Sequence, residues 1–280
     1  MSYKSILVHV DASKHAPARI SLAADLARSQ EAHLIGTAMS GLTAEYYRNI
    51  NMTFGGPLTD DQLARIRTDI EQTLDRFEAQ VFNNGLSYER RYSDDDTAAG
   101  LVQQARYADL VVLSQTDPDD ISFGLGLQLP EHLALHGGRP VLLVPYAGSY
   151  ALPQRHALVA WDGGRSATRA VTDALPLLRR CARVTVVVFN AGSAYGAHGE
   201  QPGADIALYL TRHGLNVEVQ QQQTPPELEV GDALLSLAAD CGADLLVMGA
   251  YGHQRWREIV MGGATRRVLR TMTLPVLMAH

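Results

Sequence analysis

The glycines near the end of the chain have a spacing that could hold phosphate groups. The stretch GAYGHQRWREIVMGGATRRVL runs from Gly249 to Leu269 and places glycines on both sides of a nine-residue run. Glycine permits positive φ angles and lets a ligand come close to the main chain. A helix start offers N–H groups and a positive dipole end that favour anions. Tight turns without any ligand are the alternative interpretation of the same glycines.

The apolar pattern around this stretch predicts its structural setting. Short runs of Val, Leu and Ile alternate with helical periodicity, which is typical of parallel strands buried on both faces. Ligands of such sheets lie beyond the carboxyl ends of the strands, where the strand order reverses. The predicted strands are 5–10, 33–39, 87–92, 109–114, 141–144, 157–161, 183–189, 215–220, 244–248 and 275–279, and the predicted helices are 15–29, 60–83, 95–106, 128–137, 165–180, 202–213, 228–241 and 262–271.

The chain repeats itself once. SILVHVDASKHAPARISLAADLA, from Ser5, corresponds to HALVAWDGGRSATRAVTDALPLL, from His156. ADLVVLSQ, from Ala108, corresponds to ADLLVMGA, from Ala243, at a smaller offset that indicates an insertion near residues 41–60. The repeat predicts an α/β fold with two doubly wound, parallel five-stranded sheets in a tandem pseudo-twofold arrangement. The predicted domains are residues 1–147 and 154–280, joined by the Gly-, Pro- and Ser-containing segment YAGSYALPQ.

Composition excludes several classes of function. The net charge is −6, and the first 150 residues carry 12 basic and 19 acidic side chains, so we expect no nucleic-acid partner. No apolar run is long enough to span a membrane, and the first residues lack a signal peptide, so we expect a cytoplasmic protein. Cys181 and Cys241 form no paired motif, and no HExxH is present, so neither a disulfide framework nor a metal site is expected.

The glycine motif and its flanking strand and helix resemble those of the universal stress protein family. Members that bind ATP carry G-x-x-G, nine residues and then G-[S/T], a spacing that Gly249, Gly252 and Gly262 match. The ending GGATRRVLRTMTLPVLMAH also resembles the last helix and strand of the family. The resemblance covers both copies apart from the insertion, and it implies an adenine nucleotide alpha hydrolase-like fold. One departure is Gly263, which stands where a Ser or Thr hydroxyl would contact a phosphate.

The resemblance implies that the C-terminal copy binds ATP, alone or with Mg²⁺. It places Asp162 near the ribose or base, although a carboxylate at a strand end equally well caps the following helix. Trp161 and Val188 are also consistent with packing alone, and Arg255 with a solvated loop. The implied nucleotide-binding residues are Ala160, Trp161, Asp162, Val188, Met248, Gly249, Gly252, Arg255, Gly262, Gly263, Ala264 and Thr265.

The N-terminal copy lacks this motif. Ser114 and Asp117 stand in the places of Gly249 and Gly252, and further aspartates follow. Negative charge there repels phosphates, so we expect this copy to bind no nucleotide in the usual way. Its predicted role is to pack against the second copy. The family pairs its domains through the final edge strand, which implies an internal pair through PVLLVP and PVLMAH and leaves room for a homodimer.

Three functions remain open from the sequence. The first is a stress-response or regulatory protein that binds ATP or a related adenine nucleotide in its C-terminal domain. The second is an enzyme, at most a slow ATPase, although the chain has no P-loop, no GxSxG and no lysine in either glycine region. The third is a scaffold that binds no nucleotide and responds to a partner or another small molecule.

Overall fold

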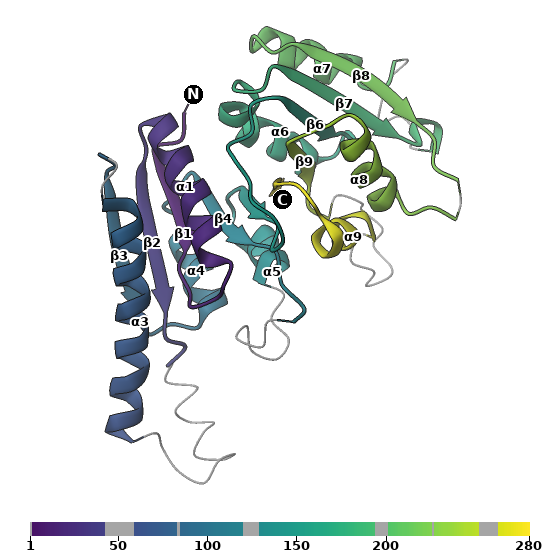
Figure 1. The fold of residues 1–280 in the computed structure, drawn as a ribbon. Helices are drawn as coiled ribbons and strands as arrows, with labels where there is room; N and C mark the ends of the chain where they lie inside the picture. The colour runs from purple at the N-terminus through teal and green to yellow at the C-terminus, as the bar shows by residue number, and fades with distance from the viewer. Residues whose placement is uncertain are drawn as a thin grey trace.

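The structure is built on one continuous ten-stranded sheet with helices on both faces (Figure 1). It is a computed structural model, and it describes residues 2–42, 59–82, 85–119, 129–193, 201–225, 227–251 and 263–280. The strand order is β3-β2-β1-β4-β5-β10-β9-β6-β7-β8, so the sheet consists of two halves with the same internal order. Each half is parallel throughout. The predicted α/β class and doubly wound halves are therefore confirmed.

The elements of the N-terminal half follow the predicted pattern closely. Its strands are β1 (Ser5–His9), β2 (His33–Met39), β3 (Tyr88–Ser93), β4 (Leu110–Ser114) and β5 (Val141–Val144). Its helices are α1 (Ala16–Gln30), α3 (Asp60–Val81), α4 (Thr97–Ala105) and α5 (Leu129–His136). Most of the predicted insertion lies outside the described residues.

The C-terminal half repeats the arrangement. Its strands are β6 (His156–Ala160), β7 (Arg183–Phe189), β8 (Val217–Gln222), β9 (Leu245–Gly249) and β10 (Val276–Ala279). Its helices are α6 (Arg165–Leu178), the short 3₁₀ helix η3 (Ala191–Ser193), α7 (Ala204–Arg212), α8 (Val230–Asp240) and α9 (Gly263–Thr271). Within the described ranges, no helix combines the length and the apolar character that crossing a bilayer demands.

The two halves join through their last strands. β5 and β10 pair antiparallel, with Leu142 opposite Leu277. Each of these strands would otherwise be an edge with a row of unpaired N–H and C=O groups. The predicted internal pairing through the terminal strands is thus confirmed, and it fuses the two five-stranded sheets into one.

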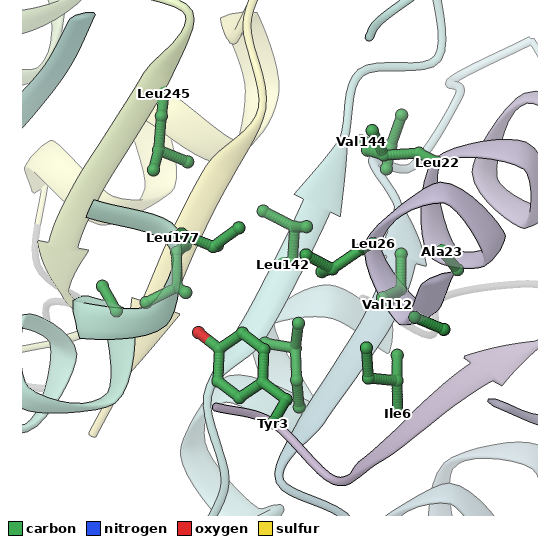
Figure 2. Packing of buried hydrophobic residues seen from close by; sticks show 14 of the residues in the cluster. Tyr3, Ile6, Leu22, Ala23, Leu26, Val112, Leu142, Val144, Leu177 and Leu245 are labelled. Carbon is green, nitrogen blue, oxygen red and sulfur yellow. The ribbon is translucent and has the colours of Figure 1, made fainter. Parts of the chain in front are cut away.

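Two apolar cores, one on each face of the sheet, run across both halves. One core takes side chains from α1, α3, α6 and α7, and the other takes them from α4, α5, α8 and α9. Figure 2 shows Leu26 of α1 and Leu177 of α6 on either side of Leu142 of β5, where the first core crosses the junction. The α5 and α9 helices share the second core beside the same junction. Both cores therefore contain side chains from both halves.

The repeated ADL motif has a structural role. The Asp109 carboxylate accepts hydrogen bonds from the backbone N–H groups of Lys4 and Ser5 at the start of β1. Asp244 occupies the equivalent place and accepts from the N–H groups of Gln154, Arg155 and His156 at the start of β6. Both aspartates tie the first strand of their half to its neighbour at the amino edge. This leaves the opposite, carboxyl edge of the sheet for ligands.

Candidate functional site

The strand order of the C-terminal half reverses between β6 and β9, and this defines where a ligand crevice is expected. Ala160 at the end of β6 pairs in register with Met248 of β9. Beyond Ala160, the Trp161 N–H still donates to the Val187 carbonyl of β7, at 2.9 Å. The ends of β6 and β9 therefore present Ala160, Trp161 and Met248 at one edge, and the contact of these residues with a nucleotide stays a prediction.

Asp162 forms the turn that leads from β6 into α6. Its Oδ1 accepts the Gly164 N–H at 2.8 Å, and Gly163 takes a positive φ of 74°. A Cβ atom on Gly164 would lie 2.9 Å from the same Asp162 oxygen, so a side chain there would displace this carboxylate. The turn role of Asp162 is observed directly, while its contact with a ribose stays a prediction.

Gly249 lacks a side chain for a packing reason. A Cβ atom placed there would lie 2.5 Å from the Ala167 nitrogen and 2.7 Å from the Ser166 carbonyl carbon, both at the start of α6. The missing side chain lets β9 and α6 approach each other at the crevice. The φ angle of Gly249 is not positive, so the backbone conformation does not by itself require glycine here. Close helix packing therefore accounts for Gly249 without any ligand.

Thr265 links the two flanks of the glycine motif. Its buried hydroxyl oxygen accepts the Tyr251 N–H at 3.2 Å, which holds the chain after β9 beside the first turn of α9. Tyr251 itself has a positive φ of 56°, which is uncommon for a residue with a side chain. Gly252, Arg255 and Gly262 fall between these flanks, outside the described residues, and their proposed roles stay predictions.

The start of α9 combines an exposed glycine with buried anchoring residues. Gly263 is exposed, and among the described residues beyond its chain neighbours no atom lies within 4 Å of a Cβ position on it. The first N–H groups of a helix have no partner within it, so those of Gly263, Ala264 and Thr265 are available donors unless something else caps them. On the other side of the helix, Gly231 of α8 lies so close that its Cβ would be 2.8 Å from Arg267 Cβ.

An ion pair and an apolar stripe anchor α9 further. Arg267 Nε lies 2.6 Å from Asp232 Oδ1 of α8. Thr265, Val268 and Leu269 are buried along the inner side of the helix. A nine-residue helix has little stability by itself, so these contacts decide where its amino end points.

The charges near the site come from both halves of the chain. Burial raises the pKa of Tyr251 to about 12; the Glu131 carboxylate adds to this shift and Arg266 opposes it. Glu131 belongs to α5 of the N-terminal half, where burial raises its pKa although Arg266 and Arg270 of α9 act in the opposite direction. The carboxylate of one half and the guanidinium groups of the other are therefore electrostatic neighbours across the junction.

Other residues at this edge divide between the two faces of the sheet. Val188 is fully buried. Its side chain lies 3.2 Å from the Cβ position of Gly203, the residue before α7, so it packs in the core beneath that helix. Ala160, Phe189 and Tyr251 pack against the core on the α8–α9 side, which also contains Met248. Val188 and Phe189 are consecutive residues of β7, so their side chains lie on opposite faces of the sheet.

Sequence reasoning missed three polar groups beyond the strand ends. Asn190 follows β7 with a φ of 52°, and its side chain bonds Thr224 through both its nitrogen and its oxygen. His280 Nδ1 lies 2.8 Å from the Ala250 carbonyl and 3.2 Å from Ser166 Oγ. Tyr251 is the third. The available signal was their position within three residues of the end of a predicted strand.

The corresponding place in the N-terminal half is filled by the chain's own side chains. Arg19 of α1 is only 1% exposed. Its Nε donates to the His9 carbonyl and its Nη1 to Ser114 Oγ, both at 2.8 Å, and its Nη2 lies 3.1 Å from Asp11 Oδ2. The position equivalent to Arg19 in the C-terminal half is Ala170, a buried residue without a polar side chain.

A second ion cluster closes the same edge. Asp117, 3% exposed, lies 2.8 Å from His15 Nε2 and 3.0 Å from Lys14 Nζ, and it accepts the Asp119 N–H at 3.0 Å. That amide, with His15 and Lys14, lowers the pKa of Asp117 to about 2. Asp117 is therefore already balanced by internal partners. The prediction that this half binds no nucleotide gains a steric reason besides charge repulsion.

Burial and ion pairing set the protonation states of His9, Asp11 and Arg19, which together we call the plug. Burial lowers the pKa of His9 to about 4, although the Asp11 carboxylate favours the charged ring. Burial alone would raise the pKa of Asp11, but the Arg19 and His9 charges and the hydrogen bonds from Ser13 lower it overall. At neutral pH the plug is thus a neutral imidazole beside a carboxylate–guanidinium pair.

The fold and this edge define a tandem α/β protein in which Arg19 and its partners fill the strand-end region of the N-terminal half. Comparison with known proteins identifies its class further. Residues 154–280 match the family model described as "Universal stress protein family". A universal stress protein of Synechocystis sp. is 41% identical over 71 residues, which span 24% of this chain and 22% of that protein.

Solved structures reproduce the architecture over the whole chain. A universal stress protein from Archaeoglobus fulgidus has a TM-score of 0.75 at 15% identity, and the match covers 98% of this chain and 94% of that one. A universal stress protein from the same organism in complex with dAMP matches 51% of this chain and 98% of that one, with 19% identity and a TM-score of 0.37. Residues 154–280 therefore carry the sequence pattern of the universal stress protein family, and the fold of the whole chain is similar to that of the first of these Archaeoglobus fulgidus proteins.

Proposed function

We propose that the C-terminal half binds ATP, with the triphosphate on the amino end of α9 and the adenosine over the ends of β6 and β9. The observation that carries this proposal is the exposed Gly263 at the start of α9, a helix that Thr265 ties to the chain after β9, beside the point where the strand order reverses. N–H donors at a helix start, together with the helix dipole, form an anion site that needs no charged side chain. In a stress-response or regulatory protein, the bound nucleotide acts as a signal or a structural ligand.

The described residues suit this ligand in size and in polarity. Among the described residues beyond its chain neighbours, no atom lies within 4 Å of a Cβ position on Gly263. Ala160 and Met248 offer an apolar surface for a base, and Asp162 lies at the strand end where a ribose would come. By the family resemblance, Gly252, Gly262 and Arg255 complete the phosphate side.

Mg²⁺, if it accompanies the nucleotide, would be carried mainly by the phosphates. Among the residues that the structure describes, no three His, Cys, Asp or Glu side chains group together to hold a metal ion. Mg²⁺ commonly binds through one or two carboxylates plus substrate phosphates and keeps several waters. Asp162 is the described carboxylate at the crevice that is placed for such a contact.

Calorimetric titration with ATP, ADP and AMP, each with Mg²⁺, tests the proposal. We expect one nucleotide per chain, affinity in the order ATP, ADP, AMP, and weaker ATP binding at higher ionic strength. Asp162→Asn keeps the oxygen that accepts the Gly164 N–H but removes the charge, so it should change affinity while the fold persists. Asp25→Asn, an exposed carboxylate of α1, is the matched control. Equal affinity for AMP and ATP, or no binding at all, would refute the phosphate assignment.

A further inference from the structure

The helix that we assign to the phosphates is capped by a residue of the other half. Gln115, which follows β4, is 1% exposed. Its Nε2 donates to the Leu269 carbonyl at 3.0 Å, and its Oε1 accepts the Tyr146 N–H at 3.3 Å. Leu269 lies in the last turn of α9, where carbonyls have no partner within the helix. Gln115 thus satisfies a buried carbonyl of α9 from across the β5–β10 junction.

This cross-junction cap has no counterpart in the opposite direction. The Gln115 N–H donates to Val144 at 2.7 Å, and the Ala250 N–H donates to Ala279 at 2.8 Å, so Gln115 and Ala250 hold equivalent places. The Ala250 side chain carries no donor or acceptor, so it cannot cap α5. The N-terminal half supports the helix of the C-terminal half, and the C-terminal half does not return this support.

An electrostatic interaction also links the same elements. Glu131 of α5 acts electrostatically on Tyr251, which precedes the glycine segment, while Arg266 and Arg270 of α9 act on Glu131. The two flanks of the proposed phosphate site therefore both have a neighbour in the N-terminal half. Tyr251 and α9 are also tied to each other through Thr265.

We propose that Gln115 is a positioning residue for the nucleotide site: by capping α9 from the N-terminal half, it fixes the direction of the helix's first N–H groups. This inference rests on the proposed function, because it concerns the same phosphate site. Under this proposal, the N-terminal half contributes to nucleotide binding by supporting α9 of the C-terminal half. The effect falls on phosphate contacts and leaves the adenosine contacts of β6 unchanged.

The test compares two hydrogen bonds that cross the junction. Gln115→Met removes the α9 cap at similar volume, and Gln115→Asn is a milder variant with a shorter amide. Tyr3→Phe is the matched control, because the Tyr3 hydroxyl donates to the Asp173 carbonyl of α6 at 2.7 Å, away from α9. We expect Gln115→Met to weaken ATP binding about five-fold, the effect of one net hydrogen bond, and adenosine binding by less than two-fold. Tyr3→Phe should leave both affinities within about two-fold of wild type.

Hydrogen exchange of the α9 amides supplies a readout that does not depend on nucleotide. These amides should exchange about five-fold faster in Gln115→Met, and at the wild-type rate in Tyr3→Phe. Unchanged exchange in Gln115→Met overturns the positioning role even if wild type binds no ATP. Equal losses of ATP and adenosine affinity overturn it as well, since they would indicate general destabilisation. Failure of wild type to bind ATP, with α9 exchange faster as expected, overturns the proposed function alone.

Discussion

Adding a hydroxyl at Gly263 should strengthen nucleotide binding. The resemblance to ATP-binding family members places Ser or Thr at this position, and no described atom beyond the neighbouring residues lies within 4 Å of the Cβ position. No overpacking cost is therefore expected. A serine hydroxyl that donates to a phosphate oxygen contributes about 1 kcal/mol net, which corresponds to about five-fold tighter binding. Replacing glycine within a helix also stabilises the fold by about 0.5 kcal/mol.

Titration calorimetry on Gly263→Ser and on wild type, with ATP and with adenosine, measures this gain. Only ATP should bind more tightly, because the hydroxyl faces the phosphate side. Ala99→Ser is a matched control, since it adds a hydroxyl to the exposed first turn of α4, whose N–H groups Asp96 already caps. If Gly263→Ser is more stable to urea but binds ATP no more tightly, the phosphates do not lie at the amino end of α9.

Three further predictions concern stability. Gly249→Ala should cost about 1–3 kcal/mol in urea unfolding, because the new Cβ would lie 2.5 Å from the Ala167 nitrogen; an unchanged midpoint contradicts the close packing of β9 on α6. Arg19→Met should cost about 3–5 kcal/mol, since it leaves Asp11 without its buried partner; an unchanged urea midpoint would contradict the buried pairing. As pH falls from 6.5 to about 4, the free energy of unfolding should drop by up to about 3 kcal/mol. The reason is that His9 stays neutral in the folded protein, whereas the imidazole of the unfolded chain takes up a proton. A free energy of unfolding that rises on acidification would contradict this sign.

Local pattern was sufficient to predict the order and bounds of most elements. The predictions for 33–39, 141–144 and 183–189 coincide with β2, β5 and β7, since each is an apolar run bounded by turn residues or prolines. The strand predicted at 215–220 begins two residues too early. Leu215 is buried but precedes β8, because an apolar side chain can enter the core from a loop.

The partners of individual side chains could not be predicted, since they depend on tertiary contacts. Gly249 fits a phosphate motif in the sequence, yet its lack of a side chain is explained by the approach of α6. Arg19 reads as an ordinary helix residue until β1 and β4 are placed beside it. The Gln115 cap on α9 spans 154 residues of sequence, and no local pattern encodes it.

A crystal structure of the full chain with a non-hydrolysable ATP analogue and Mg²⁺ tests the central claim most directly. We predict one nucleotide per chain, with its phosphate oxygens within hydrogen-bond distance of the Gly263 and Ala264 N–H groups and with Arg19 still bound to Asp11 and Ser114. A triphosphate beside Asp117, or crystals grown at saturating nucleotide in which the first turn of α9 contacts no phosphate, would contradict the account.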